Sequence, residues 1–187
     1  VTYQNDLELY EKNKSTYERE MENLRTDIAN QQEYLDHSIW INMSPYDVCE
    51  ARADLFVSTG YQIMPGMEYQ NRDNTDTILQ AYQSLLTSSA VLEDVAKQVK
   101  TEPRYLEELV EVTIGANQDG QLNRMLTIDV KHTTKEDAEE VLGAFLAHVD
   151  DMHDRIATSI GEHTVSIVNE SVSALVNLDL AELQRQQ

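Results

Sequence analysis

The chain has 187 residues, of which 41% are hydrophobic, and this length allows one sizeable hydrophobic core or two small ones. Its 34 acidic side chains outnumber its 14 basic ones, and the formal net charge of −20 disfavours binding to nucleic acid or to an anionic membrane surface. The single cysteine, Cys49, excludes an intramolecular disulfide and a cysteine-based zinc site.

The first 36 residues carry the clearest periodic signal in the chain. Alternating steps of four and three from Tyr3 meet ten positions, of which eight are apolar or aromatic, and the residues between them are mostly polar. A repeat of seven is typical of a coiled coil, whereas a helix packed on a globular core has a broader apolar stripe. We therefore predict a coiled-coil stalk helix over residues 1–36 that needs a second helix as its partner. Its seam consists of Leu7, Tyr10, Tyr17, Met21, Leu24, Ile28 and Leu35.

Beyond residue 36 the period changes. Apolar side chains alternate in SIWINM and again in CEARADLFV, on the two sides of Pro45, which predicts one interrupted strand or two strands. The segments DTILQAYQSLLTSS, SSAVLEDVAKQVK and TEPRYLEEL predict three helices. VEVTIG and RMLTIDVKH then predict two further strands, separated by a turn.

A long helix is predicted to begin near Thr133. Thr133 and Glu136 have the spacing of a capping box, and an apolar stripe continues from there to Ile160. HTVSIV and SVSALV follow as a strand broken near Asn169. A strand, a long helix and a strand in succession predict a right-handed parallel crossover. Residues 37–178 are therefore predicted to form an α+β (α/β) domain, with a mixed open sheet packed by helices and a projecting N-terminal helix.

The last residues, 179–187, have the pattern of a helix that is just beginning. Leu180 and Leu183 continue the three-four spacing of the first helix. We interpret the 187 residues as a fragment in which residues 179–187 start a descending stalk helix. That helix would return beside residues 1–36, close the seam and point both ends of the stalk towards a membrane.

Three segments carry a resemblance to a known family: SSAVLEDVAKQVK, YLEELVEVTIG, and NRMLTIDVKHTTKEDAEEVLGAFLAHV. The order and spacing of these elements, over roughly residues 75–178, resemble the Wzz-like chain-length determinants, the polysaccharide co-polymerase family. The resemblance implies a non-enzymatic extracytoplasmic domain at the cell membrane, tethered by flanking membrane helices.

The same resemblance implies partners. The chain is expected to form a homo-oligomer and to work with the polysaccharide polymerase or export machinery of capsule or exopolysaccharide biosynthesis. Gram-positive relatives also serve as adaptors for a cytoplasmic tyrosine kinase, so such a kinase is a further expected partner. Arg104, Glu107 and Arg155, on predicted helical faces, are candidates for contacts between subunits.

The only cluster that resembles a metal site is HVDDMHD, residues 148–154. On a helix Asp150, His153 and Asp154 share a face, and hard or borderline cations use such ligands. The solvated side of the long helix explains the same residues more simply, so we predict no metal, cofactor or catalytic residue. Two other classes stay open: a sensor or adhesion module that binds a sugar or peptide on the sheet face, and a hydrolase with a divalent metal at these residues.

Overall fold

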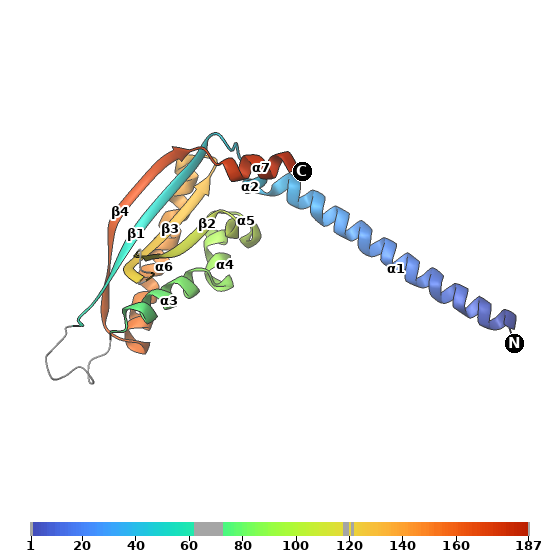
Figure 1. Ribbon diagram of the computed structural model, residues 1–187, viewed down its shortest axis with the longest axis horizontal. Helices are drawn as coiled ribbons and strands as arrows, with labels where there is room; N and C mark the ends of the chain where they lie inside the picture. The colour runs from blue at the N-terminus through green and yellow to red at the C-terminus, as the bar shows by residue number, and fades with distance from the viewer. Residues whose placement is uncertain (1, 62–72, 118–119, 121, 187) are drawn as a thin grey trace. The chain divides into compact units, whose positions relative to one another are not determined.

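The computed structural model describes residues 2–61, 73–117, 120 and 122–186, and these fall into two compact units, Val1–Asn42 and Met43–Gln187 (Figure 1). The first unit consists of helix α1, Thr2–His37, and the single turn α2, Ile39–Asn42. The predicted helix over residues 1–36 is therefore confirmed. The strand predicted in SIWINM is wrong, because the Ser38 hydroxyl accepts a hydrogen bond from the Ile41 amide at 3.3 Å and starts a helical turn there.

The second unit is built on one open sheet of four strands in the order β2-β3-β1-β4. The strands are β1, Val48–Thr59; β2, Val110–Ala116; β3, Leu122–His132; and β4, His163–Leu175. Every neighbouring pair is antiparallel, so the predicted open sheet is confirmed and its mixed character is wrong. β3 and β4 do run parallel to each other, but β1 lies between them, which makes the predicted crossover a split βαβ unit.

Helices fill both crossovers of this sheet. α3, Thr75–Leu86, α4, Ser89–Gln98, and α5, Pro103–Glu107, join β1 to β2, and α6, Lys135–Ser159, joins β3 to β4. The chain ends in α7, Leu178–Gln186. The βαββαβ order with this strand arrangement is that of a ferredoxin-like domain, and the α+β class predicted from the sequence is confirmed.

The core lies between the sheet and the helices α3 and α6. Alternate residues of β1 are buried on the helix side, and the residues between them lie on the opposite face, which we name the open face. The apolar stripes predicted for the two helices are buried as expected. They include Ile78, Leu79, Tyr82 and Leu86 on α3, and Ala138, Val141, Leu142, Phe145, Val149, Met152 and Ile156 on α6.

The cap of α6 lies one residue later than predicted. Thr134 is the N-cap: its Oγ1 accepts a hydrogen bond from the Asp137 amide at 3.1 Å and donates one to the Asp137 carboxylate at 2.6 Å. The predicted box of Thr133 and Glu136 is wrong. The segment TTKED contains two threonine-to-acid pairs with the same spacing, so the spacing alone could not choose between them.

Replacing Thr134 with alanine is expected to lower the free energy of unfolding by about 1 kcal/mol, because the first turn of α6 loses its side-chain acceptor. The matched control is Thr133→Ala, which removes the same hydroxyl one residue earlier and should have a clearly smaller effect. Urea unfolding followed by circular dichroism measures both changes. A larger loss for Thr133→Ala than for Thr134→Ala would contradict the assigned cap.

Candidate functional site

The predicted seam of α1 forms an exposed apolar surface. Six of its seven residues are exposed, and the seventh, Met21, is half-buried. Leu24 and Ile28 near the middle are each 56% exposed, and Tyr17 is 63% exposed. Large apolar side chains in water at heptad spacing are the pattern of a helix that packs against a second helix.

Two exposed ion pairs on α1 contribute little to its stability. Its ion pairs, Lys14–Glu18 at 3.9 Å and Arg25–Glu22 at 3.8 Å, join largely exposed side chains, and such pairs contribute about 0.3–0.5 kcal/mol each. A helix of 36 residues extends for roughly 54 Å at 1.5 Å per residue. Because most helical stability in proteins comes from packing an apolar face, the seam is the part of α1 that requires a partner.

Leu180 and Leu183, the predicted continuation of the seam, lie on α7 and differ in burial. Leu180 is 1% exposed and Leu183 is 39% exposed. The Asn177 side chain caps α7, because its Oδ1 accepts a hydrogen bond from the Leu180 main-chain amide at 3.0 Å. The main-chain amide of Asn177 donates a hydrogen bond to the Pro45 carbonyl at 2.7 Å. The pairing of α7 with the seam stays a prediction, and Leu180 already has a buried environment.

Asp150, His153 and Asp154 are on α6 as predicted, but they do not converge. The His153 Nε2 lies 3.0 Å from the main-chain oxygen of His163, and its Nδ1 lies 3.3 Å from the Asp154 carboxylate, which is 99% exposed. Both contacts raise the pKa of His153, and the contact with the main-chain oxygen of His163 has the larger effect. Within the described ranges, no three His, Cys, Asp or Glu side chains come close enough together to hold a metal ion.

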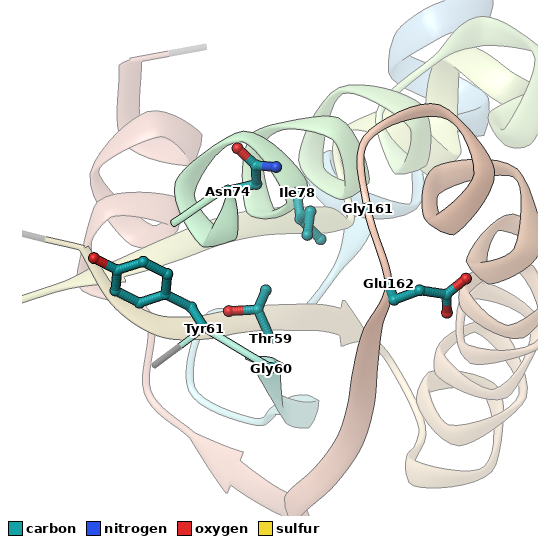
Figure 2. Close-up of a pocket in the computed structure, with 7 residues that line it drawn as sticks. All are labelled: Thr59, Gly60, Tyr61, Asn74, Ile78, Gly161 and Glu162. Atoms are coloured by element: carbon teal, nitrogen blue, oxygen red, sulfur yellow. The ribbon is translucent and has the colours of Figure 1, made fainter. Parts of the chain in front are cut away.

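A cavity of about 250 Å³ lies where β1 ends, α3 begins and α6 turns into β4 (Figure 2). Its lining contains two ionisable side chains, Tyr61 and Glu162, and Figure 2 shows the Glu162 carboxylate directed away from Tyr61. The described lining residues include no nucleophile beside a general base. The lining residues are Thr59, Gly60, Tyr61, Asn74, Ile78, Gly161 and Glu162.

A buried hydrogen bond joins α3 to the start of β4, next to this cavity. The Tyr82 hydroxyl lies 2.9 Å from His163 Nε2, and His163 Nδ1 lies 2.9 Å from the Gly161 carbonyl oxygen. Burial, together with the charge of Asp150, raises the pKa of Tyr82 to about 12. Because the Gly161 carbonyl oxygen can only accept, Nδ1 carries the proton in the neutral His163 ring, and the Tyr82 hydroxyl then donates to Nε2. The pair anchors the start of β4 to α3.

The open face of the sheet carries an ionic network that the sequence analysis missed. Asp54 accepts hydrogen bonds from Thr127 Oγ1 at 2.7 Å, Asn169 Nδ2 at 2.9 Å and Arg52 Nε at 3.1 Å. Arg52 also lies 3.5 Å from the Asp129 carboxylate. The signal was present in CEARAD, where charged residues alternate with small ones, but the partners on β3 and β4 could not be assigned before the strand register was known.

The pKa values of the two carboxyl groups of this network shift in opposite directions. Burial alone would raise the pKa of Asp54, but the hydrogen bonds from Asn169, Thr127 and Arg52 outweigh it, and the pKa of Asp54 is lowered. Burial raises the pKa of Asp129, and Arg52 only partly compensates. Asp54 therefore stabilises the fold above its ordinary pKa of 3.8, and this contribution is lost as the pH falls through its lower folded pKa.

Replacing Asp54 with alanine is expected to lower the free energy of unfolding by about 2 kcal/mol at pH 7, because three hydrogen bonds to a carboxylate are lost. The difference from the unmodified chain should shrink as the pH falls below 3.8 and should be smallest below the lowered folded pKa, where the carboxyl is protonated in both states. Glu111→Ala is the control, since its carboxylate is 63% exposed on the same sheet and lies 3.9 Å from Lys131. A difference that does not depend on pH in urea unfolding would contradict this role.

Comparison with known proteins does not identify a family for this chain. No protein-family model and no curated protein matches the chain. Among solved structures, it is similar to the crystal structure of an amidase of the hydantoinase/carbamoylase family from Burkholderia vietnamiensis, with 16% sequence identity and a TM-score of 0.26. The match covers 75% of this chain and 32% of the amidase chain, so this chain spans about a third of that protein. A likeness of this size carries no argument about activity.

None of the helices in the described part of the chain combines the length and the apolar character that crossing a bilayer requires.

Proposed function

We propose that this chain is a non-enzymatic assembly domain of a membrane protein, located on the extracytoplasmic face of the cell membrane. In this proposal copies of the chain join one another, and the assembly regulates the length or the export of a polysaccharide such as a capsule or exopolysaccharide. The observation that carries the proposal is the exposed apolar seam of α1, because such a surface on a 36-residue helix is suited to helix pairing.

Two further observations support a scaffold over an enzyme. Among the described residues, the lining of the cavity beside Thr59 has no paired nucleophile and base, and in the ionic network of the open face Asp54 is held by three hydrogen bonds. The resemblance to Wzz-like chain-length determinants supports four further parts of the proposal: the polysaccharide itself, the polymerase or export partner, the membrane tether and the tyrosine kinase. They are proposed on that ground.

The cellular role is tested in the source organism by deleting the gene and restoring it in two forms. The unmodified form should restore the length distribution of the surface polysaccharide, measured by gel electrophoresis of the purified glycan. A form with glutamates at Leu24 and Ile28 should restore it only partly or not at all. An unchanged length distribution after deletion, with the polysaccharide still made and exported, would remove this role. Binding of a purified sugar or peptide to the open face would then favour the sensor or adhesion module.

The net charge of −20 predicts how assembly responds to salt. Copies that each carry this charge repel one another, and the Debye length falls from about 10 Å at 0.1 M salt to about 3 Å at 1 M. Assembly is therefore expected to strengthen between 0.05 and 0.5 M sodium chloride (about a tenfold range), and further with millimolar divalent cations. Sedimentation velocity measures the change, and weaker assembly at higher salt would contradict it.

A further inference from the structure

The outer edge of β4 is a second surface that is suited to assembly. β4 is an edge strand in the order β2-β3-β1-β4 and, with 13 residues, it presents a long row of main-chain groups. Among the described residues no strand pairs with this outer side. Figure 1 shows β4 along the border of the sheet. Unpaired amide and carbonyl groups of an edge strand are ready to pair with another strand.

Apart from Glu170 and a bulge at Val168, β4 has little that protects this edge. The strand contains no lysine, arginine or proline, which are the residues that usually discourage edge pairing. Ile167 and Val168 are 51% and 55% exposed, and just beyond the strand Val176 and Leu178 are 56% and 71% exposed. Exposed large apolar side chains outside α1 are thus concentrated on and directly after β4.

The opposite edge of the sheet is partly occupied. On β2 the Gln83 side chain of α3 donates a hydrogen bond to the Val112 carbonyl at 2.9 Å. An approaching strand would have to displace or avoid this side chain. The two edges are therefore not equivalent, and β4 is the more available one.

The charge distribution indicates the partner. The chain carries a net charge of −20, but β4 contains a single acidic residue, Glu170. Along its 13 residues, β4 therefore adds little to the repulsion between two copies that approach there. We propose that β4 pairs antiparallel with β4 of a second copy across a two-fold axis, so that the two sheets become continuous. This inference rests on the proposed self-assembly, but it uses an interface distinct from the seam of α1.

The register of this pairing is limited by a bulge and by Glu170. The pairing of β4 with β1 shifts between Asp54 and Leu55, which leaves Val168 as an extra residue and leaves residues 169–175 as the longer regular stretch. A two-fold axis at Glu170 would place two carboxylates opposite each other, which is destabilising. An axis at Val172 avoids this contact and places Ser171 opposite Ser173 of the second copy.

The test uses the full chain with glutamates at Leu24 and Ile28, so that pairing through the seam is removed. Sedimentation velocity of this form should still show a dimer. Adding Ala174→Glu, which places a carboxylate opposite Glu170 of the second copy, should raise its dissociation constant at least tenfold, whereas Thr113→Glu, the same kind of charge added to the exposed part of β2, should leave it unchanged. Far-ultraviolet circular dichroism verifies that each variant is folded.

A second measurement tests the register and needs no destabilising change. Both cysteine variants carry Cys49→Ala, so that the introduced thiol is the only one in each chain. Chains with Ser171→Cys are mixed with chains with Ser173→Cys and then oxidised. The mixture should give disulfide-linked dimers in higher yield than either chain alone. Equal yields would overturn the Val172 axis.

If the seam-disrupted chain is monomeric while the unmodified chain assembles, the β4 inference is wrong and the proposed function stands. If the unmodified chain is also monomeric at every salt concentration, both are wrong.

Discussion

Replacing Phe145 with alanine should lower the free energy of unfolding by about 3–5 kcal/mol. Phe145 is 0% exposed and belongs to the core between the sheet, α3 and α6, so the truncation removes buried apolar contacts and leaves a cavity. A domain of this size is typically stable by about 5–15 kcal/mol, so the loss is a large fraction of the total.

Urea unfolding of the variant measures this loss directly, with the slope of the transition as a test that both chains unfold in the same way. The matched control is Leu146→Ala, on the same helix, where the side chain is only partly buried against the core. Its cost should be clearly smaller. A loss below about 1 kcal/mol for Phe145→Ala would show that this core is not packed as described.

The double substitution Leu24→Glu and Ile28→Glu is expected to abolish pairing through α1. Both side chains are 56% exposed, so the change should leave the fold of the second unit intact while it places two carboxylates in an apolar seam. Pairing would then bury these two charges. The free-energy cost of burying them far exceeds the free energy gained by burying the two apolar side chains. Light scattering after gel filtration should show the loss of the seam-dependent species.

A control with the same charge separates the seam from the charge itself. Asn23 and Asn30 are exposed on α1 and lie outside the seam, so Asn23→Glu with Asn30→Glu adds the same two charges to the same helix. This control should assemble almost as well as the unmodified chain. Equal losses for the two double variants would mean that net charge, and not the apolar seam, governs assembly.

The elements with long periodic patterns were predictable from the sequence, and the pairings between distant elements were not. The stripes of α3 and α6 repeat over several turns and were identified correctly. In contrast, SIWINM is too short for its period to separate a strand from a helical turn, and TTKED contains two equivalent cap spacings. Local patterns of a few residues do not decide between alternatives that tertiary contacts decide.

The sheet shows the same limit at a larger scale. A strand, a helix and a strand in succession indicated two parallel strands, which β3 and β4 are, but nothing local indicates that β1 lies between them. The network around Asp54 depends on this insertion, because Thr127 and Asn169 come from the two neighbours of β1. The seam of α1, by contrast, is a property of one helix, and its exposure could be predicted from residues 1–36 alone.

If the apolar seam of α1 joins this chain to another helix, the mass of the unmodified protein in solution must exceed that of one chain. Sedimentation equilibrium across a hundredfold range of concentration (about 1 to 100 μM, where interfaces of moderate affinity are populated) gives that mass. We predict masses that rise with concentration and salt towards multiples of 21.4 kDa, and a lower mass for the Leu24→Glu, Ile28→Glu form. A constant 21.4 kDa for the unmodified chain at every concentration and salt would contradict the account.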